Sequence, residues 1–397
     1  MHATQASADP RDFSIVLGGP LYQLLRRAHM AGDALELARR RIVAFALIGW
    51  LPLLILSLAQ GRAWGTDVAV PFVKDIEVHV RFLVAVPLLV AAELLVHMRL
   101  RPVAGEFLVR GLVPEESIAR FRECVQSAFR LRNSIVAEVL MLAFVYGVGV
   151  PFVWRHYAGL DVGTWYAQAM PTGPRLTAAG LWFACVSVPV FQFLLLRWYF
   201  RMFIWTRFLW QVSRIRLSIS AMHGDGSAGL AFLNGTVFAF VPLLMAHGAL
   251  LAGVVANRIF YTGATLMDAR IEIAVVVVYL LILVLLPLTV FAPQVNDAKR
   301  HASRIYGRLT QRYVRDFESK WLADDMPVRD TPLGAGDIQS LADLNNALAH
   351  VRATKTIPVT REAVVKLALA TLLPVAPLLL TMIPAEELAT RLVKLLL

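Results

Sequence analysis

Two glutamates interrupt stretches of sequence that are otherwise apolar, and ionisable groups in such places are costly and mark candidate sites. Glu93 stands six residues before Arg99, and Glu138 stands six residues after Arg132. At a helical rise of ~1.5 Å per residue, each carboxylate lies ~9 Å inward from a flanking arginine. Two carboxylates in one low-dielectric layer could hold a proton or a bound cation between them. Their spacing therefore predicts a polar site for ion or small-solute transport, with a cation or a proton as ligand.

Further polar side chains fall at a similar depth on two other apolar stretches. Gln192 stands five residues before Arg197, and Asn234 stands five residues after Gly229. Either spacing corresponds to ~7.5 Å along a helix. We therefore expect four helices to contribute polar groups to one layer.

Two histidines extend the set of candidate residues. Glu93, His97 and Arg101 are four residues apart and so share one helix face. His247 is the one ionisable side chain in the fifth apolar stretch. A neutral histidine hydrogen-bonded between helices is the simpler interpretation of His247, and proton relay is the alternative.

A structural role is the alternative for the glutamates. Each carboxylate would then pair with an arginine near the membrane surface, at a depth that water reaches. For the transport alternative, we expect Glu93 and Glu138, on adjacent spans of opposite direction, to approach each other closely. If no cation or arginine then lies between them, the pair would hold one proton, and Glu93→Gln would stabilise the protein at neutral pH. The residues alone leave both alternatives open.

The segment HGDGS contains His223 and Asp225, which could bind a metal ion or a phosphate beside a glycine-rich turn. A single H-x-D pair is weak evidence for a metal. Asp225 or Ser227 as a helix cap, with Gly224 and Gly226 forming the turn, explains the same residues without a ligand. The capping interpretation is favoured.

Signatures of nucleotide-binding and hydrolytic enzymes are absent, since the sequence contains no G-x-x-x-x-G-K-[ST], H-E-x-x-H, G-x-S-x-G or paired C-x-x-C motif. No cofactor is therefore expected, and no catalytic residue is assigned. A membrane-embedded lipid-modifying enzyme is a third alternative, with His97, His223 and Asp225 as its candidates. Transport is the first hypothesis. The second is a non-catalytic scaffold or signalling component that binds a partner through cytoplasmic helices.

The elements that must position these residues are membrane-spanning helices. Of the 397 residues, 58% are hydrophobic and 17% charged, and the mean hydropathy is +0.61. In ordinary soluble domains, roughly 45–50% of the residues are apolar and about 25% are charged. A spanning helix needs about 20 mostly apolar residues. Seven stretches qualify, which predicts an all-α polytopic transmembrane bundle; they are residues 42–60, 82–98, 134–154, 176–196, 229–257, 273–293 and 367–385.

The distribution of basic residues predicts the orientation. With the N-terminus in the cytoplasm, the inside segments hold 30 of the 39 Lys and Arg residues. Cytoplasmic loops of membrane proteins carry such an excess. The net charge of +11 is therefore explained by the membrane. The seventh stretch contains Pro374, Pro377 and Pro384, and is either a kinked span or a re-entrant segment.

Four parts follow from this organisation: a cytoplasmic N-terminal segment 1–41, a six-span bundle 42–293, a cytoplasmic helical subdomain 294–366, and the proline-broken segment with its tail, 367–397. Leucines and arginines in 21–28 suit a helix on the membrane surface. In 294–366, one apolar stripe recurs at helical spacing within a basic stretch: Tyr306, Leu309, Tyr313, Phe317 and Trp321.

A second stripe in this subdomain lies in 337–351, on a helix that Asp337 could cap. Its apolar positions are Ile338, Leu341, Leu344, Leu348 and Val351. Packing within the protein is the favoured interpretation of this stripe, and contact with a protein partner or a second copy is the alternative.

The basic and aromatic run 197–216 resembles nucleic-acid surfaces in composition only. Its arginines share no single helical face, and it directly follows a span. Snorkelling guanidinium groups beside anionic lipid headgroups explain it more simply. The lipid bilayer is therefore the expected partner, and nucleic acid is not.

Four segments resemble a family of uncharacterised bacterial multi-pass membrane proteins: FSIVLGGPLYQLLRRAHM (13–30), HGDGSAGLAFL (223–233), GAGDIQSLADL (334–344) and LLPVAPLLLTMIPAEEL (372–388). Members of the family read H-P-D-x-x-G-G-L at the second segment. Here His223, Asp225 and Gly229 match, whereas Gly224 and Ala228 depart. The resemblance implies a bacterial inner-membrane location, and it implies no activity.

Overall fold

Seven helical segments that are long and apolar enough to cross a membrane make up most of the protein, which is an all-α multi-pass membrane protein. The computed structural model describes residues 13–20, 23, 34–65, 68–152, 164–168, 175–322 and 334–382. Each predicted span has a helical counterpart, so the predicted fold class is confirmed. The segments are Arg39–Ala59, Ile76–Val109, Ile135–Phe152, Ala178–Val212, Ala231–Thr262, Leu266–Trp321 and Arg361–Met382.

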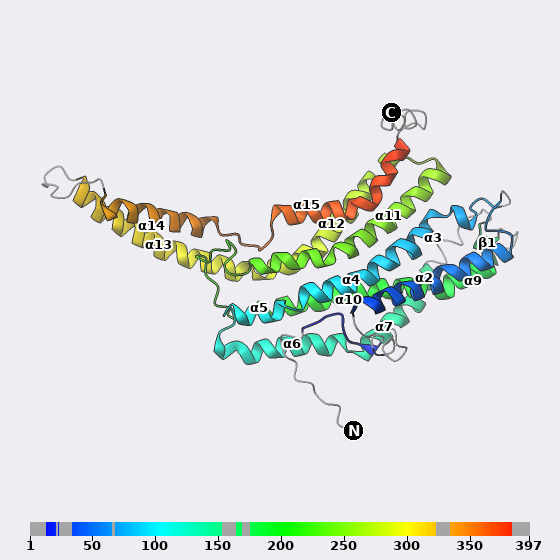
Figure 1. Ribbon diagram of the computed structural model, residues 1–397, viewed down its shortest axis with the longest axis horizontal. Coiled ribbons are helices and arrows are strands. Elements are labelled where there is room, and N and C mark those ends of the chain that lie inside the picture. Colours follow the sequence, from blue (N-terminus) through cyan, green and yellow to red (C-terminus); the bar gives the residue numbers. More distant parts are fainter. Residues whose placement is uncertain are drawn as a thin grey trace, which may run out of the picture.

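The helices and strands follow one another in a simple order (Figure 1). The α-helices are α2 (Ala34–Ala59), α3 (Ile76–Val80), α4 (Val86–Leu100), α5 (Val103–Val109), α6 (Ile118–Arg132), α7 (Ile135–Phe144), α9 (Ala178–Trp182), α10 (Val188–Val212), α11 (Val241–Thr262), α12 (Arg270–Leu285), α13 (Ala292–Trp321), α14 (Gly336–Ala353) and α15 (Arg361–Leu372). Two short strands, β1 (Ala167–Gln168) and β2 (Arg175–Leu176), pair antiparallel.

Shorter helical segments join or extend the α-helices. Three are π-helical: η3 (Arg81–Ala85), η5 (Val145–Gly149) and η6 (Phe183–Ser187). The others are 3₁₀-helical: η2 (Phe72–Lys74), η4 (Glu115–Ser117), η7 (Ala231–Phe240), η8 (Leu266–Ala269), η9 (Leu286–Phe291) and η10 (Leu373–Met382).

Prolines explain where the π-helical turns fall. Each of the three turns is followed by valine and then proline, at Pro87, Pro151 and Pro189. A proline inside a helix has no N–H to donate, and its ring clashes with the carbonyl four residues earlier. A wider turn before the proline relieves that clash, so these three spans stay helical through the proline.

Several helical segments are longer than a bilayer requires. The segment Ala178–Val212 has 35 residues. At ~1.5 Å per residue it is ~52 Å long, against a hydrocarbon layer of ~30 Å. The C-terminal part of α10 packs against α6, and α4 leads directly into α5. The bundle thus continues beyond the apolar band at the end that carries α6, which we call the α6 end (Figure 1).

Exposed apolar side chains identify the faces turned toward lipid. They lie on α2, α7 with η5, α12, and α15 with η10, and include Leu47, Ile55, Val136, Leu140, Tyr146, Val275, Ile282, Leu369 and Leu379. On α2 such residues begin at Val43, and on α7 they begin at Ile135. Large aromatic side chains fill the interior instead, including Trp198, Trp205, Phe208 and Phe240.

The seventh segment is a continuous helix from Arg361 to Met382. Its 22 residues are enough to cross a membrane. Pro374 and Pro377 lie in its 3₁₀-helical part, η10. It packs along α11, where Gly248 allows a close approach: a Cβ at that position would lie 2.0 Å from the backbone oxygen of Thr371. Small residues permit such contacts between membrane helices.

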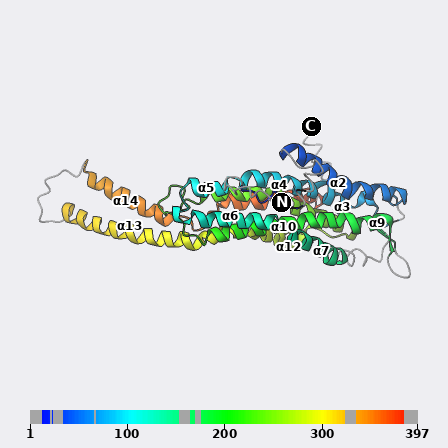
Figure 2. The same ribbon diagram turned by 90° about the horizontal axis from the view of Figure 1, so that it is seen from below.

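The helices α13 and α14 form an antiparallel hairpin that projects from the α6 end along the long axis of the molecule (Figures 1 and 2). The Tyr313 hydroxyl donates to the Asp337 carbonyl, at 3.0 Å. Lys320 and Trp321 donate to the Asp337 carboxylate, at 2.7 and 3.1 Å. The prediction that Asp337 caps α14 is wrong, because Ala335 occupies the cap and Asp337 binds the end of α13.

The N-terminal segment Phe13–Gly19 lies inside the bundle rather than on its surface. Phe13, Ile15 and Val16 are 0%, 1% and 4% exposed. The Phe13 ring lies 4.6 Å from Phe208 and 6.0 Å from Phe129, measured between centroids. The surface helix predicted for 21–28 falls outside the described residues, apart from Gln23.

Candidate functional site

Buried charges gather where α2, α4, α7 and α10 meet. Glu93 on α4 forms ion pairs with Arg41 on α2, at 2.6 Å, and with Arg201 on α10, at 2.8 Å. The Glu93 and Arg201 side chains are 8% and 6% exposed, so these pairs are largely removed from water. One carboxylate thereby joins three helices.

Glu138 on α7 completes the arrangement. Its Oε1 lies 3.7 Å from Nη2 of Arg197, which is one turn before Arg201 on α10. Arg197 interacts electrostatically with Glu93 as well as with Glu138. We call Arg41, Glu93, Glu138, Arg197 and Arg201 the charge layer. It lies at the level where the exposed apolar faces of α2 and α7 begin.

The charge layer is not a bare pair of carboxylates. Arginines lie against both Glu93 and Glu138, which is the geometry of the structural alternative. The condition under which Glu93→Gln would stabilise the protein, that no arginine lies against the two carboxylates, is therefore not met. The arginines of these ion pairs come from other spans, since Arg41 lies on α2 and Arg197 and Arg201 lie on α10.

Two arginines of the run 197–216 are placed differently from the prediction. Arg197 and Arg201 are 6% and 5% exposed and pair with glutamates, so they do not snorkel toward lipid headgroups. The reason is that α10 continues to Val212, well past the predicted end of the span at residue 196. Residues expected at a membrane boundary are therefore interior residues of a longer helix.

The N-terminal segment covers the charge layer from the α6 end. Arg132 donates to the Ser14 carbonyl at 2.6 Å, and Asn133 accepts from the Gly19 N–H at 3.0 Å. The Ser14 hydroxyl lies 3.1 Å from Nδ1 of His97. The predicted site residue His97 is thus one turn from Glu93 and bound to the covering segment.

Little open space remains beside the glutamates. A cavity of about 10 Å³ lies among Ile15, Glu138, Arg197 and Arg201. This is about the room that one water molecule needs. Transport through this layer would require a wider, water-filled path. The transport role therefore stays a prediction.

The other polar residues predicted for the layer make their contacts elsewhere. Gln192 donates to the Gly149 carbonyl at 3.4 Å. Asn234 accepts from the Thr360 N–H at 3.0 Å, next to the start of α15. Each joins two spans, as polar groups between membrane helices commonly do.

His247 also binds within the bundle. Its Nε2 lies 2.7 Å from the Tyr199 hydroxyl on α10, and its Nδ1 lies 2.8 Å from the Leu243 carbonyl. Both ring nitrogens therefore have partners, as the simpler interpretation of a histidine bonded between helices requires. Proton relay through His247 stays a prediction.

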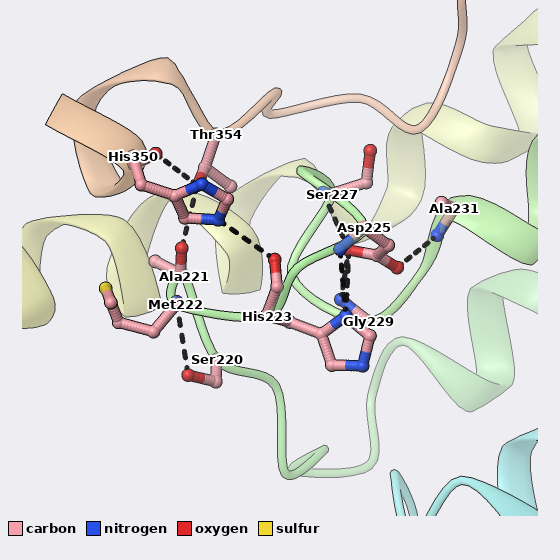
Figure 3. A network of polar contacts seen from close by, with 10 residues as sticks. All are labelled: Ser220, Ala221, Met222, His223, Asp225, Ser227, Gly229, Ala231, His350 and Thr354. Carbon is pink, nitrogen blue, oxygen red and sulfur yellow. Dashed lines mark hydrogen bonds and ion pairs between the residues drawn. The ribbon is translucent and has the colours of Figure 1, made fainter. Parts of the chain in front are cut away.

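The HGDGS segment forms a tight loop around Asp225 (Figure 3). The Asp225 carboxylate accepts from the N–H groups of Ser227, Gly229 and Ala231, at 2.9, 3.0 and 3.0 Å. The Asp225 N–H donates to Nδ1 of His223 at 3.2 Å. His223 and Asp225 are thus occupied with the loop's own backbone.

The same loop is fastened to the base of the α13–α14 hairpin (Figure 3). The Thr354 hydroxyl donates to the Ala221 carbonyl at 2.8 Å, and His350 Nε2 lies 3.1 Å from the His223 carbonyl. Ala228 in this loop has a φ of +57°, a left-handed conformation that glycine adopts more easily than alanine. The loop therefore joins the fifth span to the hairpin.

Asp225→Ala is expected to lower the free energy of unfolding by about 2 kcal/mol, because three backbone donors lose a charged acceptor. Although partial burial acts to raise it, the N–H donors of Ser227, Ala231 and Gly229 hold the pKa of Asp225 below its usual range. Its contribution is therefore full above about pH 4 and is lost as pH falls through the lowered pKa. Denaturant unfolding at pH 7 and pH 3 measures this difference. The exposed Asp297→Ala should change stability little at either pH, and an equal loss in both variants would contradict the assignment.

A second buried polar network was missed by the sequence reasoning. Asp75, 3% exposed, accepts from Trp165 Nε1 and Asn257 Nδ2, each at 2.8 Å. It joins the start of α3 to the β1 region and to the end of α11. An aspartate immediately before an apolar stretch was the available signal, but its partners are 90 and 182 residues away.

No group of three or more His, Cys, Asp or Glu side chains that could hold a metal ion occurs within the described ranges. No known protein family, curated protein or solved structure matches the chain. The family resemblance therefore stays a prediction, and the site is interpreted from its geometry alone.

Proposed function

We propose that this membrane protein is a non-catalytic scaffold or signalling component whose α13–α14 hairpin binds an acidic partner protein outside the membrane. The observation that carries the proposal is a row of exposed arginines on α13: Arg300, Arg304, Arg308 and Arg312. We call this row the basic ridge. Its members are four residues apart and so lie on one side of the helix.

Like charges four residues apart destabilise a helix by about 0.2–0.5 kcal/mol per pair. The basic ridge contains three such pairs in succession. Arg300 forms an exposed ion pair with Asp297, while Arg304, Arg308 and Arg312 form none with a described residue. An acidic partner would remove the repulsion along the ridge, which favours a binding role over a structural one.

Apolar side chains beside the ridge support a protein as partner. Ile305 and Leu309 are 42% and 49% exposed, on a part of the chain outside the apolar band. The hairpin buries its facing stripes only in part, since two helices cannot enclose them. A partner helix with acidic and apolar positions would cover both kinds of residue.

The direction of the hairpin argues against the membrane surface as the ligand. Figures 1 and 2 both show α13 and α14 running away from the bundle along its long axis. Arg312 stands eighteen residues after Gln294, or ~27 Å further along the helix. Anionic headgroups attract basic groups only within about a Debye length, ~8 Å.

The proposed orientation places the α6 end and the N-terminus in the cytoplasm of a bacterial cell, with the bundle in the inner membrane. The excess of Lys and Arg in the segments at this end supports it. The resemblance of segments 13–30, 223–233, 334–344 and 372–388 supports the bacterial inner membrane.

The test uses the full chain in nanodiscs and a synthetic amphipathic helix with glutamates four residues apart beside a pair of leucines. We expect this peptide to bind, and we expect R304Q/R308Q to raise its dissociation constant at least tenfold. Binding should weaken as salt is added, because exposed charges are screened. Fluorescence anisotropy of the labelled peptide measures both effects.

The control is R120Q/R130Q, which removes two exposed arginines from α6 and should leave peptide binding unchanged. I305S/L309S should weaken binding of the peptide but not binding of an oligonucleotide of equal charge. An oligonucleotide that binds more tightly than the peptide, or a peptide affinity that R304Q/R308Q leaves intact, would show that the hairpin has no such partner.

A further inference from the structure

The α6 end of the bundle contains a pocket that the charge layer and the hairpin do not use. Its volume is about 380 Å³, and it lies between α6 and the C-terminal part of α10. Pockets for small ligands commonly measure about 300–1,000 Å³. Its charged lining residues are Arg120, Glu123, Arg130, Arg207 and Arg214.

The positive charges of this pocket are poorly neutralised. Four arginines face one carboxylate, and none of the four forms an ion pair within the described part of the chain. Arg207 donates to the Ser127 hydroxyl at 2.6 Å, which holds its guanidinium at the pocket wall. Arg214 lies over the Trp210 ring, 5.1 Å from its centroid.

We infer that this pocket binds a phosphate-bearing anion through Arg120, Arg130, Arg207 and Arg214. Guanidinium groups donate two parallel hydrogen bonds to phosphate oxygens, so an arginine cluster suits phosphate better than a single carboxylate. The lone carboxylate, Glu123, leaves an excess of positive charge and can accept a hydrogen bond from a hydroxyl of the ligand.

The position of the pocket allows two sources for the phosphate. Arg207 and Arg214 follow Arg197 by ten and seventeen residues. At the helical rise of ~1.5 Å per residue, they lie ~15 and ~25 Å further from the charge layer. The headgroup layer is only about 5–8 Å thick on each side. A lipid headgroup could reach the near side of the pocket, whereas a soluble phosphate compound could fill all of it.

Cys124 also lines this pocket and provides a direct readout. It is partly buried, and burial together with Glu123 raises the pKa of its thiol, so labelling is measured at pH 8.5. In the C185S background, Cys124 is the sole cysteine. We expect inorganic pyrophosphate to slow maleimide labelling of Cys124 at least fivefold, compared with sodium chloride at equal ionic strength.

Two variants and two lipid compositions complete the experiment. R120Q/R130Q should abolish the protection, while R304Q/R308Q on the hairpin should retain it. Nanodiscs of zwitterionic lipid report the soluble anion, and nanodiscs containing phosphatidylglycerol, without pyrophosphate, report the headgroup. Protection in either arm that depends on Arg120 and Arg130 supports the inference and identifies the source.

Calorimetric titration with pyrophosphate, and native mass spectrometry of retained phosphatidylglycerol, cover the case in which Cys124 does not react. No protection and no binding in either arm would overturn the inference. Binding that R120Q/R130Q leaves unchanged would overturn it equally. These outcomes are independent of peptide binding to the hairpin.

Discussion

Glu93→Ala is expected to lower the free energy of unfolding by about 3–5 kcal/mol, the loss typical of breaking a buried ion pair from one side. The variant leaves Arg41 and Arg201 charged and facing the same space, which is largely removed from bulk water. Arg197 adds a further positive charge nearby. Glu93→Gln should also destabilise, because it keeps the shape of the side chain but not its charge. Denaturant titration in mixed micelles measures both variants.

The matched control is Glu272→Ala. Glu272 pairs with Arg258 at 2.8 Å, but both side chains are 46% exposed. Such a pair contributes about 0–1 kcal/mol, because water screens it. A second variant, E93Q/R201Q, should recover part of the loss, since it removes one of the unpaired cations. If Glu93→Ala and Glu272→Ala cost the same, the charge layer does not hold the helices together.

Gly248→Ala is expected to destabilise the protein, whereas Gly307→Ala should not. A Cβ on Gly248 would lie 2.0 Å from the Thr371 oxygen and 3.0 Å from its carbonyl carbon. Those are backbone atoms of α15 and cannot rotate away, so α11 and α15 must separate. We expect a loss of about 3 kcal/mol, at the upper end for an overpacked contact.

A Cβ on Gly307 would meet no atom within 4 Å. Gly307 lies in the interior of α13, where alanine is favoured over glycine by about 1 kcal/mol. The same substitution should therefore stabilise the hairpin or leave it unchanged. Thermal unfolding of both variants in one detergent makes the comparison. A neutral Gly248→Ala would mean that the seventh segment does not pack against α11 as closely as described.

The fold class could be predicted because its determinants are local. A run of about 20 apolar residues spans a bilayer wherever it occurs, so seven runs predicted seven helices. The irregular turns in three spans also have a local cause, since Pro87, Pro151 and Pro189 are visible in the sequence and each follows a π-helical turn by two residues. What could not be predicted was how far the helices continue beyond the apolar band, because amphipathic extensions such as the end of α10 depend on burial against α6 and its neighbours.

The candidate site could likewise be predicted only in part, because its carboxylates are visible in the sequence and their partners are not. Glu93 and Glu138 could be found from the sequence, because a carboxylate in an apolar run is conspicuous and costly. Their partners could not, since Arg41 and Arg201 lie 52 and 108 positions away and looked like ordinary flanking charges. Gln192 and Asn234 matched them in depth but point to other helices.

The sequence by itself therefore determined the number of spans, the polar groups buried within them and the basic character of one end. The tertiary structure alone decided which charges neutralise one another, that the segment Phe13–Gly19 covers them, and that four arginines surround one pocket. The physical reason is range. Hydrophobic length acts along about 20 consecutive residues. Ion pairs act over a few ångströms between residues that only helix packing brings together.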